Sequence, residues 1–346
     1  MKSLILILAL LCGLFLPARA SELSPPEVPD SAESLMPDEE QTFGEGLWYV
    51  VTTAIRTLKP ELAAGIRVCL GVLVVSILTA VLRAFPGGAS DVVDMVGAVA
   101  VAGLLLGSTN SLIGTSEQAV EQLSDYGKML LPVMAATVAA QGGTTSATAL
   151  YSGTAIFDAL LSGVISKALV PMVYAFLTVA VADCVLDGDF LKRVRDFVKW
   201  MVTWCLKTIL YIYTGYMSIT GVVTGTTDKA ALKAAKLTIS GAVPVVGGIL
   251  SDASEALLVS AGVVKSATGI YGMWAIIAVA IGPFLKVGIR YLLLKAVAAV
   301  SEIFAGKKTT VLLQDFSTAM GLLLGMTGAM SLLFIISVVC LMKGVG

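Results

Sequence analysis

LAAGIRVCLGVLVVSILTAVL, residues 62–82, contains one charged residue, Arg67, in an otherwise uncharged run. An α-helix rises 1.5 Å per residue, so a helix of this length crosses the roughly 30 Å of hydrocarbon in a lipid bilayer. The stretch therefore predicts a transmembrane helix.

Similar stretches recur along the whole chain of 346 residues, of which 57% are hydrophobic and only 14% charged. A soluble domain of this size could not bury so much apolar surface. We expect an all-α, polytopic integral membrane protein with about eight transmembrane helices. The apolar stretches are residues 62–82, 92–113, 147–165, 168–186, 201–223, 270–285, 287–304 and 320–342.

Two further apolar stretches, residues 129–143 and 241–264, are poor uniform spans. Helix-breaking residues interrupt both, namely Pro132, Gly142 and Gly143 in the first, and Pro244, Gly247 and Gly248 in the second, which also contains Asp252. Lipid cannot satisfy backbone N–H and C=O groups that leave a helix. We therefore expect two broken or re-entrant segments that are buried in protein or line a watery cavity.

The N-terminus resembles an export signal. Residues 1–20 contain Lys2, the apolar run 4–16 and the small-residue site Ala18-Arg19-Ala20, as in a secretory signal peptide. The alternative is an uncleaved first membrane helix, for which the apolar run is short. A cleaved signal would leave the new N-terminus outside the cytoplasm.

The next segments differ in composition. Residues 21–46 hold four prolines and eight acids without a base, which predicts a disordered extracytoplasmic linker. Residues 47–61 place Trp48 and Tyr49 on an apolar helical face and predict an interfacial amphipathic helix. Residues 62–346 form the polytopic membrane domain.

Two basic segments lie between the spans. Residues 189–199 alternate apolar and charged side chains, which predicts a helix along the cytoplasmic surface, and Lys229, Lys233 and Lys236 indicate a second one. Both could equally be the solvated faces of loop helices. The charges are too few and too well neutralised to indicate a nucleic-acid partner.

An internal repeat is suggested by two similar series. Pro132 is followed by Asp158-Ala-Leu-Leu, and Pro244 by Glu255-Ala-Leu-Leu. Such a match arises either from duplication or from the chance alignment of small apolar residues. Paired broken helices of this kind occur in secondary transporters.

Catalytic chemistry has little support in the sequence. The chain has no histidine and no C-x-x-C pair, so we expect no metal site, no cofactor and no catalytic residues. No pairing of a nucleophile with a base is evident, which argues against an enzyme.

Charged residues in apolar stretches are the candidates for functional or assembly roles, because burying charge in hydrocarbon is costly. These charged residues are Arg67, Asp158, Lys207, Asp252, Glu255, Arg290 and Lys295. The candidate site residues are Asp158, Lys207, Asp252 and Glu255, together with the helix breakers Pro132, Pro244, Gly247 and Gly248. Asp252 and Glu255 lie three residues apart, on one helical face just after the break at Pro244, and could hold a cation or proton. Alternatively both acids lie at a membrane surface, and Lys207 extends to the head groups.

The segment GAVPVVGGILSDASE, residues 241–255, with the spans around it, resembles the stage III sporulation protein AE family. The resemblance extends from about residue 47 onward. It implies a role in endospore formation, in the mother-cell membrane around the forespore, within a multi-protein channel or secretion-like complex. The implied partners are an ATPase, small membrane proteins, ring-forming proteins and a forespore-side channel protein, besides the lipid bilayer.

Two functions follow from these observations. The first is a non-enzymatic membrane subunit of that complex, either part of the conduit or the platform on which other subunits assemble. The alternative is a secondary transporter or permease that moves a small solute coupled to an ion, as the broken segments and intramembrane acids suggest.

Overall fold

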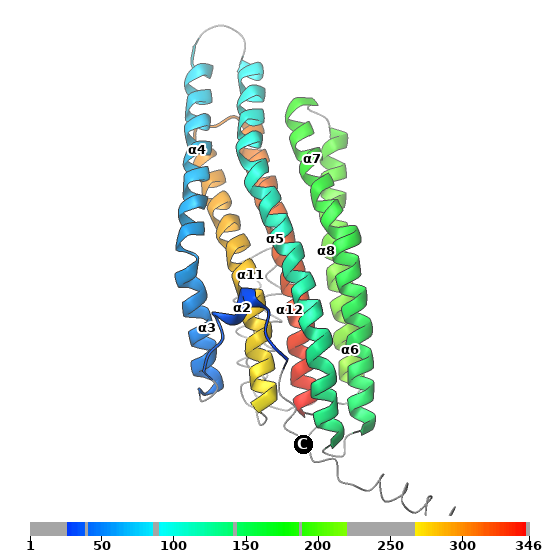
Figure 1. Cartoon of the computed structure of the whole chain (residues 1–346). Coiled ribbons are helices and arrows are strands. Elements are labelled where there is room, and N and C mark those ends of the chain that lie inside the picture. Colours follow the sequence, from blue (N-terminus) through cyan, green and yellow to red (C-terminus); the bar gives the residue numbers. More distant parts are fainter. Residues whose placement is uncertain are drawn as a thin grey trace, which may run out of the picture.

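The protein is a bundle of long helices (Figure 1). The computed structural model describes residues 26–38, 41–85, 90–140, 144–186, 189–219 and 267–343. Every regular element in these ranges is helical, in agreement with the predicted all-α class. The elements are α2 (Asp30–Glu33), α3 (Phe43–Thr57), α4 (Lys59–Arg83), α5 (Ser90–Ala140), α6 (Thr144–Val164), the π-helical turn η1 (Ile165–Leu169), α7 (Val170–Leu186), α8 (Asp189–Ile219), α11 (Ala267–Ser301) and α12 (Lys307–Lys343).

Five helices in the described ranges are long and apolar enough to cross a membrane, where the sequence predicted about eight. The predicted span 201–223 lies mostly in α8, which is not one of the five, and two pairs of predicted spans are single helices. The stretches 147–165 and 168–186 join through η1, and the stretches 270–285 and 287–304 form α11. Lys286 lies inside α11 and its Nζ is 3.3 Å from a carboxylate oxygen of Glu61 on α4, so its charge has a partner without a break in the helix.

The predicted break at Pro132 is wrong, because α5 continues through this residue to Ala140. Proline removes one backbone hydrogen bond, and long membrane helices tolerate this loss when neighbours or water satisfy the freed carbonyl. Pro283 lies inside α11 in the same way. The second predicted break, at Pro244, Gly247 and Gly248, lies outside the described residues, as does the second copy of the suggested repeat.

The helix at the centre of the bundle is α12. It packs against α5, α6, α7, α8 and α11, and 89% of its most apolar window is buried. Large side chains fill the space around it, and those with almost no exposure include Trp274, Tyr126, Tyr213, Phe176, Phe316 and Phe334. A helix that is apolar on all sides is buried in this way.

The outer helix α4 has the opposite environment, since only 28% of its most apolar window is buried. Most of its exposed side chains are aliphatic, with Arg67 exposed among them, and the aliphatic ones include Leu62, Ile66, Leu70, Val74, Ile77, Leu78, Val81 and Leu82. This surface is suited to contact with lipid tails.

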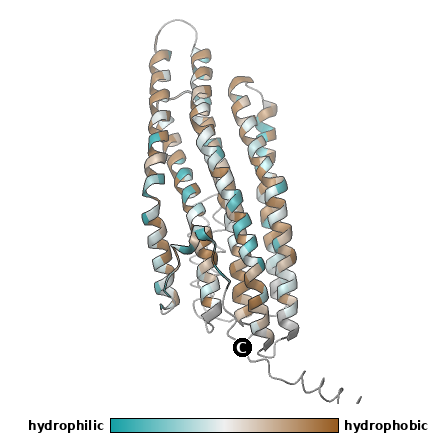
Figure 2. Ribbon diagram, in the orientation of Figure 1, coloured by the Kyte–Doolittle hydropathy of each residue, from teal (hydrophilic) through white to brown (hydrophobic). Residues whose placement is uncertain are grey.

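The bundle is taller than a bilayer. The 51 residues of α5 span about 76 Å at 1.5 Å per residue, whereas the hydrocarbon core measures about 30 Å. Figure 2 shows hydrophilic residues along the middle of α5, where Glu117, Glu121 and Asp125 lie, and hydrophobic residues on either side. Part of the bundle therefore extends beyond the hydrocarbon.

The two ends of the bundle are distinct. The hairpin end, at the top of Figure 1, is where α4 is followed by α5, α7 by α8, and α11 by α12. The C-terminal end carries the last residues of α12. Tyr216 of α8 donates a hydrogen bond to the Ala149 carbonyl near the start of α6, at 2.8 Å, and Gly269 of α11 lies against Met342. The end of α8 and the start of α11 thus lie at the same end of the bundle.

Part of the predicted disordered linker is ordered. Ala32 and Leu35 are buried, and the Ser31 hydroxyl donates to the Gln122 side chain of α5 at 3.1 Å. These apolar contacts outweigh the acidic composition on which the prediction rested. Residues 1–25, including the predicted signal peptide, lie outside the described residues.

Helix α3 covers most of the predicted interfacial helix. Its inner face buries Val50 and Ala54, and the Trp274 indole of α11 donates to the Phe43 carbonyl at 3.3 Å. Trp48 on its outer face is exposed. The predicted amphipathic pattern therefore serves at least to dock α3 on the bundle.

Candidate functional site

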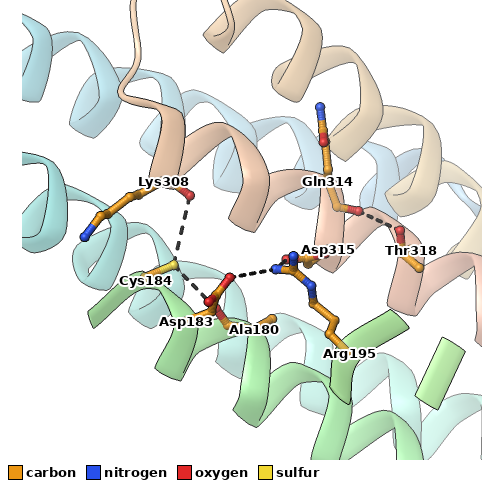
Figure 3. Close-up of polar contacts among 8 residues, drawn as sticks. All are labelled: Ala180, Asp183, Cys184, Arg195, Lys308, Gln314, Asp315 and Thr318. Atoms are coloured by element: carbon orange, nitrogen blue, oxygen red, sulfur yellow. Dashed lines mark hydrogen bonds and ion pairs between the residues drawn. The ribbon is translucent and has the colours of Figure 1, made fainter. Parts of the chain in front are cut away.

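An ionic group joins three helices at the hairpin end (Figure 3). The Arg195 guanidinium of α8 donates to the Asp183 carboxylate of α7 at 3.2 Å and also to the Asp315 carboxylate of α12. All three side chains are largely buried. We call these residues the ionic triad.

The helical repeat of α8 explains why Arg195 points inward. Val198 and Val202 follow at three and seven residues, on the same face, and both are buried. An arginine carried by that face enters the bundle interior. Breaking such a buried pair by removing one partner typically costs about 3–5 kcal/mol, so the ionic triad fixes how α7, α8 and α12 pack.

A charged cleft of about 770 Å³ surrounds the ionic triad and opens at the hairpin end. Its walls come from α5, α7, α8 and α12. Its charged lining consists of Asp91, Asp94, Asp183, Asp196, Asp315, Lys192, Arg195, Lys199, Lys307 and Lys308. This balance of acids and bases differs from the apolar lining of most small-molecule pockets.

The rim of the cleft contains a second ion pair. Arg83 at the end of α4 lies 3.0 Å from the Asp94 carboxylate of α5. Asp94 also approaches Gly306 closely, and a Cβ added to this glycine would fall within 2.6 Å of a carboxylate oxygen. An acid beside the N-terminus of α12 suits the positive end of that helix.

A separate polar pair lies deeper in the bundle. The Ser124 hydroxyl of α5 donates to Oδ2 of Asp158 on α6 at 3.1 Å, and Asp158 is only 2% exposed. The other carboxylate oxygen, Oδ1, has no hydrogen-bond partner among the described residues. Asp158 is thus the predicted site residue that the structure places in the interior.

Near the C-terminal end, the Tyr213 hydroxyl of α8 forms a third polar group. It donates to the Leu333 carbonyl of α12 at 3.2 Å and contacts the Ser337 hydroxyl. The Thr154 hydroxyl of α6 lies 3.5 Å away. These contacts join α6, α8 and α12, the central helix again being one of the three.

The other predicted site residues are not gathered into one site. Lys207 and Pro132 are both exposed, on α8 and α5. Pro244, Gly247, Gly248, Asp252 and Glu255 lie outside the described residues. The prediction of a cation or proton site at Asp252 and Glu255 therefore stays a prediction.

The ionic triad was not predicted from the sequence. Residues 189–199 were expected to form a helix along the cytoplasmic surface; they are helical, but they begin the longer helix α8, which packs along α7, and Arg195 points into the bundle. Asp183 did lie in a predicted span, where an acid indicates a buried partner. The spacing from Arg195 to Val198 and Val202 was the second available signal.

Similarity to known proteins identifies the family of this chain. The chain is 23% identical over 235 residues to the stage III sporulation protein AE of Bacillus subtilis (strain 168). That match covers 68% of this chain and 59% of the relative, so the chain spans less than two thirds of the relative's length. No solved structure matches the chain.

A family model described as stage III sporulation protein AE matches residues 33–344. The match includes every helix from α3 to α12, together with the ionic triad and Asp158. Since the model covers most of the sequence, the chain belongs to the stage III sporulation protein AE family.

Proposed function

We propose that this chain is a non-enzymatic membrane subunit of a channel or secretion-like complex between mother cell and forespore. Within that complex it acts as the platform on which other subunits assemble. Its family membership and the five candidate membrane spans among the described residues support this role.

The observation that carries the platform role is the packing of α12. A conduit needs a polar, hydrated path along its axis. In the described part of this bundle, the axis is occupied by α12, and Phe334, Trp274 and Tyr126 fill the space beside it. Such a closely packed interior favours a rigid scaffold over a pore within the chain.

The secondary transporter has less support. That alternative depended on two broken segments that would meet near the membrane midplane. At Pro132 the helix continues, and the second segment lies outside the described residues. Asp158 has an unpartnered oxygen, but its direct hydrogen-bond partner is the Ser124 hydroxyl, so the contact does not by itself indicate transport.

The orientation that we propose follows from charge. Five Lys or Arg residues line the cleft at the hairpin end, and Arg83 lies beside it. Basic residues accumulate on the cytoplasmic side of a membrane. The hairpin end would then face the cytoplasm, where an ATPase could reach it, and a cleaved signal peptide over residues 1–20 would place the opposite end in the intermembrane space.

Deletion and purification test this function in the organism that encodes the chain. Cells without the chain should lose heat-resistant spores, and expression of the full-length protein should restore them. The tagged chain, purified from sporulating membranes, should retain an ATPase and other membrane subunits. Normal spore yield in the deletion strain would refute the proposal.

A further inference from the structure

One face of α8 carries exposed aromatic side chains along most of its length. Phe190, Phe197, Trp204 and Tyr211 recur every seven residues, with Trp200 between them, and all five are between 52% and 74% exposed. A seven-residue interval keeps side chains on one stripe of a helix. These five residues, the aromatic ridge, extend about 32 Å at 1.5 Å per residue.

The aromatic ridge is ordered by its own contacts. The ring centroids of Phe197 and Trp200 are 6.0 Å apart, and those of Trp200 and Trp204 are also 6.0 Å apart in a stacked arrangement. The opposite face of α8 holds the helix in the bundle, through buried residues such as Val202 and Leu206. The aromatic ridge therefore lies on the side of α8 away from the buried residues that hold this helix in the bundle.

Two exposed cations lie in the same stripe. Arg193 and Lys207 are separated by fourteen residues, or about 21 Å along the helix. They continue the heptad spacing, because Arg193, Trp200 and Lys207 are also seven residues apart. The stripe is therefore aromatic and cationic together.

This composition does not suit lipid tails. The exposed face of α4 is aliphatic except for Arg67 near one end, whereas the stripe on α8 combines two cations with five aromatic rings, and a cation that faces hydrocarbon is costly. Among the described helices, α8 is not one of the five candidate spans. Tryptophan, tyrosine and arginine are the residues enriched at the energetic centres of protein interfaces. The stripe thus resembles a surface for protein, and α4 a surface for lipid.

A second copy of this chain is a poor occupant, because of charge. In a two-fold symmetric pair of parallel α8 helices, Arg193 would face Arg193 and Lys207 would face Lys207. In an antiparallel pair, Arg193 would lie opposite Lys207. Either arrangement brings like charges together, which is destabilising.

We propose that the aromatic ridge docks one membrane helix of a different protein. This helix presents small or aliphatic residues to the aromatic rings and carboxylates about two heptads apart to Arg193 and Lys207. The inference rests on the proposed function, since the partner is taken to be another subunit of the sporulation complex.

Photocrosslinking tests the docking surface in sporulating cells that express the full chain. The photoreactive residue benzoylphenylalanine replaces Trp204 in one strain and Leu70 in a control strain. Leu70 is 56% exposed on the aliphatic face of α4. The Trp204 position should yield a polypeptide adduct that maps to an Asp- or Glu-bearing membrane helix of another protein. The Leu70 position should yield lipid adducts only.

Charge variants then test the mode of docking. Lys207→Glu should lower the yield of the Trp204 adduct at least about tenfold, because it sets two carboxylates against each other. Lys207→Arg is the matched control and should keep the yield. A Lys in place of the facing carboxylate of the partner should restore the adduct in Lys207→Glu.

Three results would overturn the docking surface. They are an adduct with a second copy of this chain, lipid adducts alone at Trp204, and an adduct yield unaffected by Lys207→Glu. The spore count of the deletion strain distinguishes a failure of the docking surface from a failure of the proposed function. If the deletion strain forms no spores, these results reject the docking surface alone, and normal spores in that strain would reject the subunit role itself.

Discussion

Replacing Arg195 by alanine removes the cation that joins Asp183 to Asp315. Two largely buried carboxylates would then face each other without the guanidinium that contacts both. Breaking a buried ion pair from one side costs about 3–5 kcal/mol. We therefore expect α7, α8 and α12 to separate locally at the hairpin end of Arg195→Ala, while the C-terminal end keeps its packing.

Cys184 reports this opening, because its buried thiol lies next to the ionic triad, 4.0 Å from the Lys308 carbonyl. In a variant that retains only this cysteine, the rate of maleimide labelling measures how often the helices separate. A loss of about 3 kcal/mol corresponds to labelling about a hundredfold faster. A variant that retains only Cys340, buried near the C-terminal end, is the control and should keep its rate.

A neutral variant separates the effect of charge from the effect of size. Arg195→Met combined with Asp183→Asn and Asp315→Asn removes every charge of the ionic triad, and such replacements are often close to neutral. It should label much more slowly than Arg195→Ala. Equal labelling of Cys184 in the wild type and in Arg195→Ala would refute the role of the ionic triad.

Three further predictions concern other parts of the bundle. Gly127→Ala should destabilise the protein by about 1–3 kcal/mol, because the new methyl group would overlap the Phe334 ring. Gly103→Ala on the same helix has open space around the new methyl group and should be neutral or stabilising. Thermal melting in detergent compares the two variants. Tyr213→Phe should cost only about 0.5–1.5 kcal/mol by the same assay, because it removes the hydrogen bond to the Leu333 carbonyl while the Ser337 hydroxyl still donates to that carbonyl. An unchanged melting temperature would contradict the contribution of the Tyr213 contact. The Thr42 hydroxyl and backbone N–H donate to the Glu45 carboxylate and lower the pKa of Glu45. This cap should therefore stabilise α3 fully above the ordinary glutamate pKa, and the stabilisation should be lost as the pH falls through the lowered pKa. Amide exchange in the first turn of α3 should show this loss, and Glu45→Ala should abolish the pH dependence.

Two of the long apolar helices, one outer and one central, were the most predictable from sequence. The stretch 62–82 lies within α4, and the stretch 320–342 lies within α12, because long apolar runs with at most one charged residue leave few alternatives to a helix. It was less predictable that two neighbouring predicted spans would form one continuous helix. From the sequence alone, Lys286 indicates the end of a span, because its ion-pair partner Glu61 is distant in sequence.

The interior polar groups were predictable only in part. An acid within an apolar run, such as Asp158, indicates a buried partner by itself. The partner of Arg195 is harder to infer, because Asp315 is 120 residues away and only the tertiary packing of α12 brings it close. An arginine on an amphipathic helix is more often solvated, so the surface-helix prediction for residues 189–199 followed the commoner case.

The most direct test of the platform role is the permeability of proteoliposomes that contain the purified chain alone. The account predicts no ion-coupled uptake of small solutes, because α12 and its neighbours fill the axis of the described bundle. It also predicts that wild type and Asp158→Asn behave alike. Uptake by the wild-type chain that is lost in Asp158→Asn would contradict the account and favour a transporter.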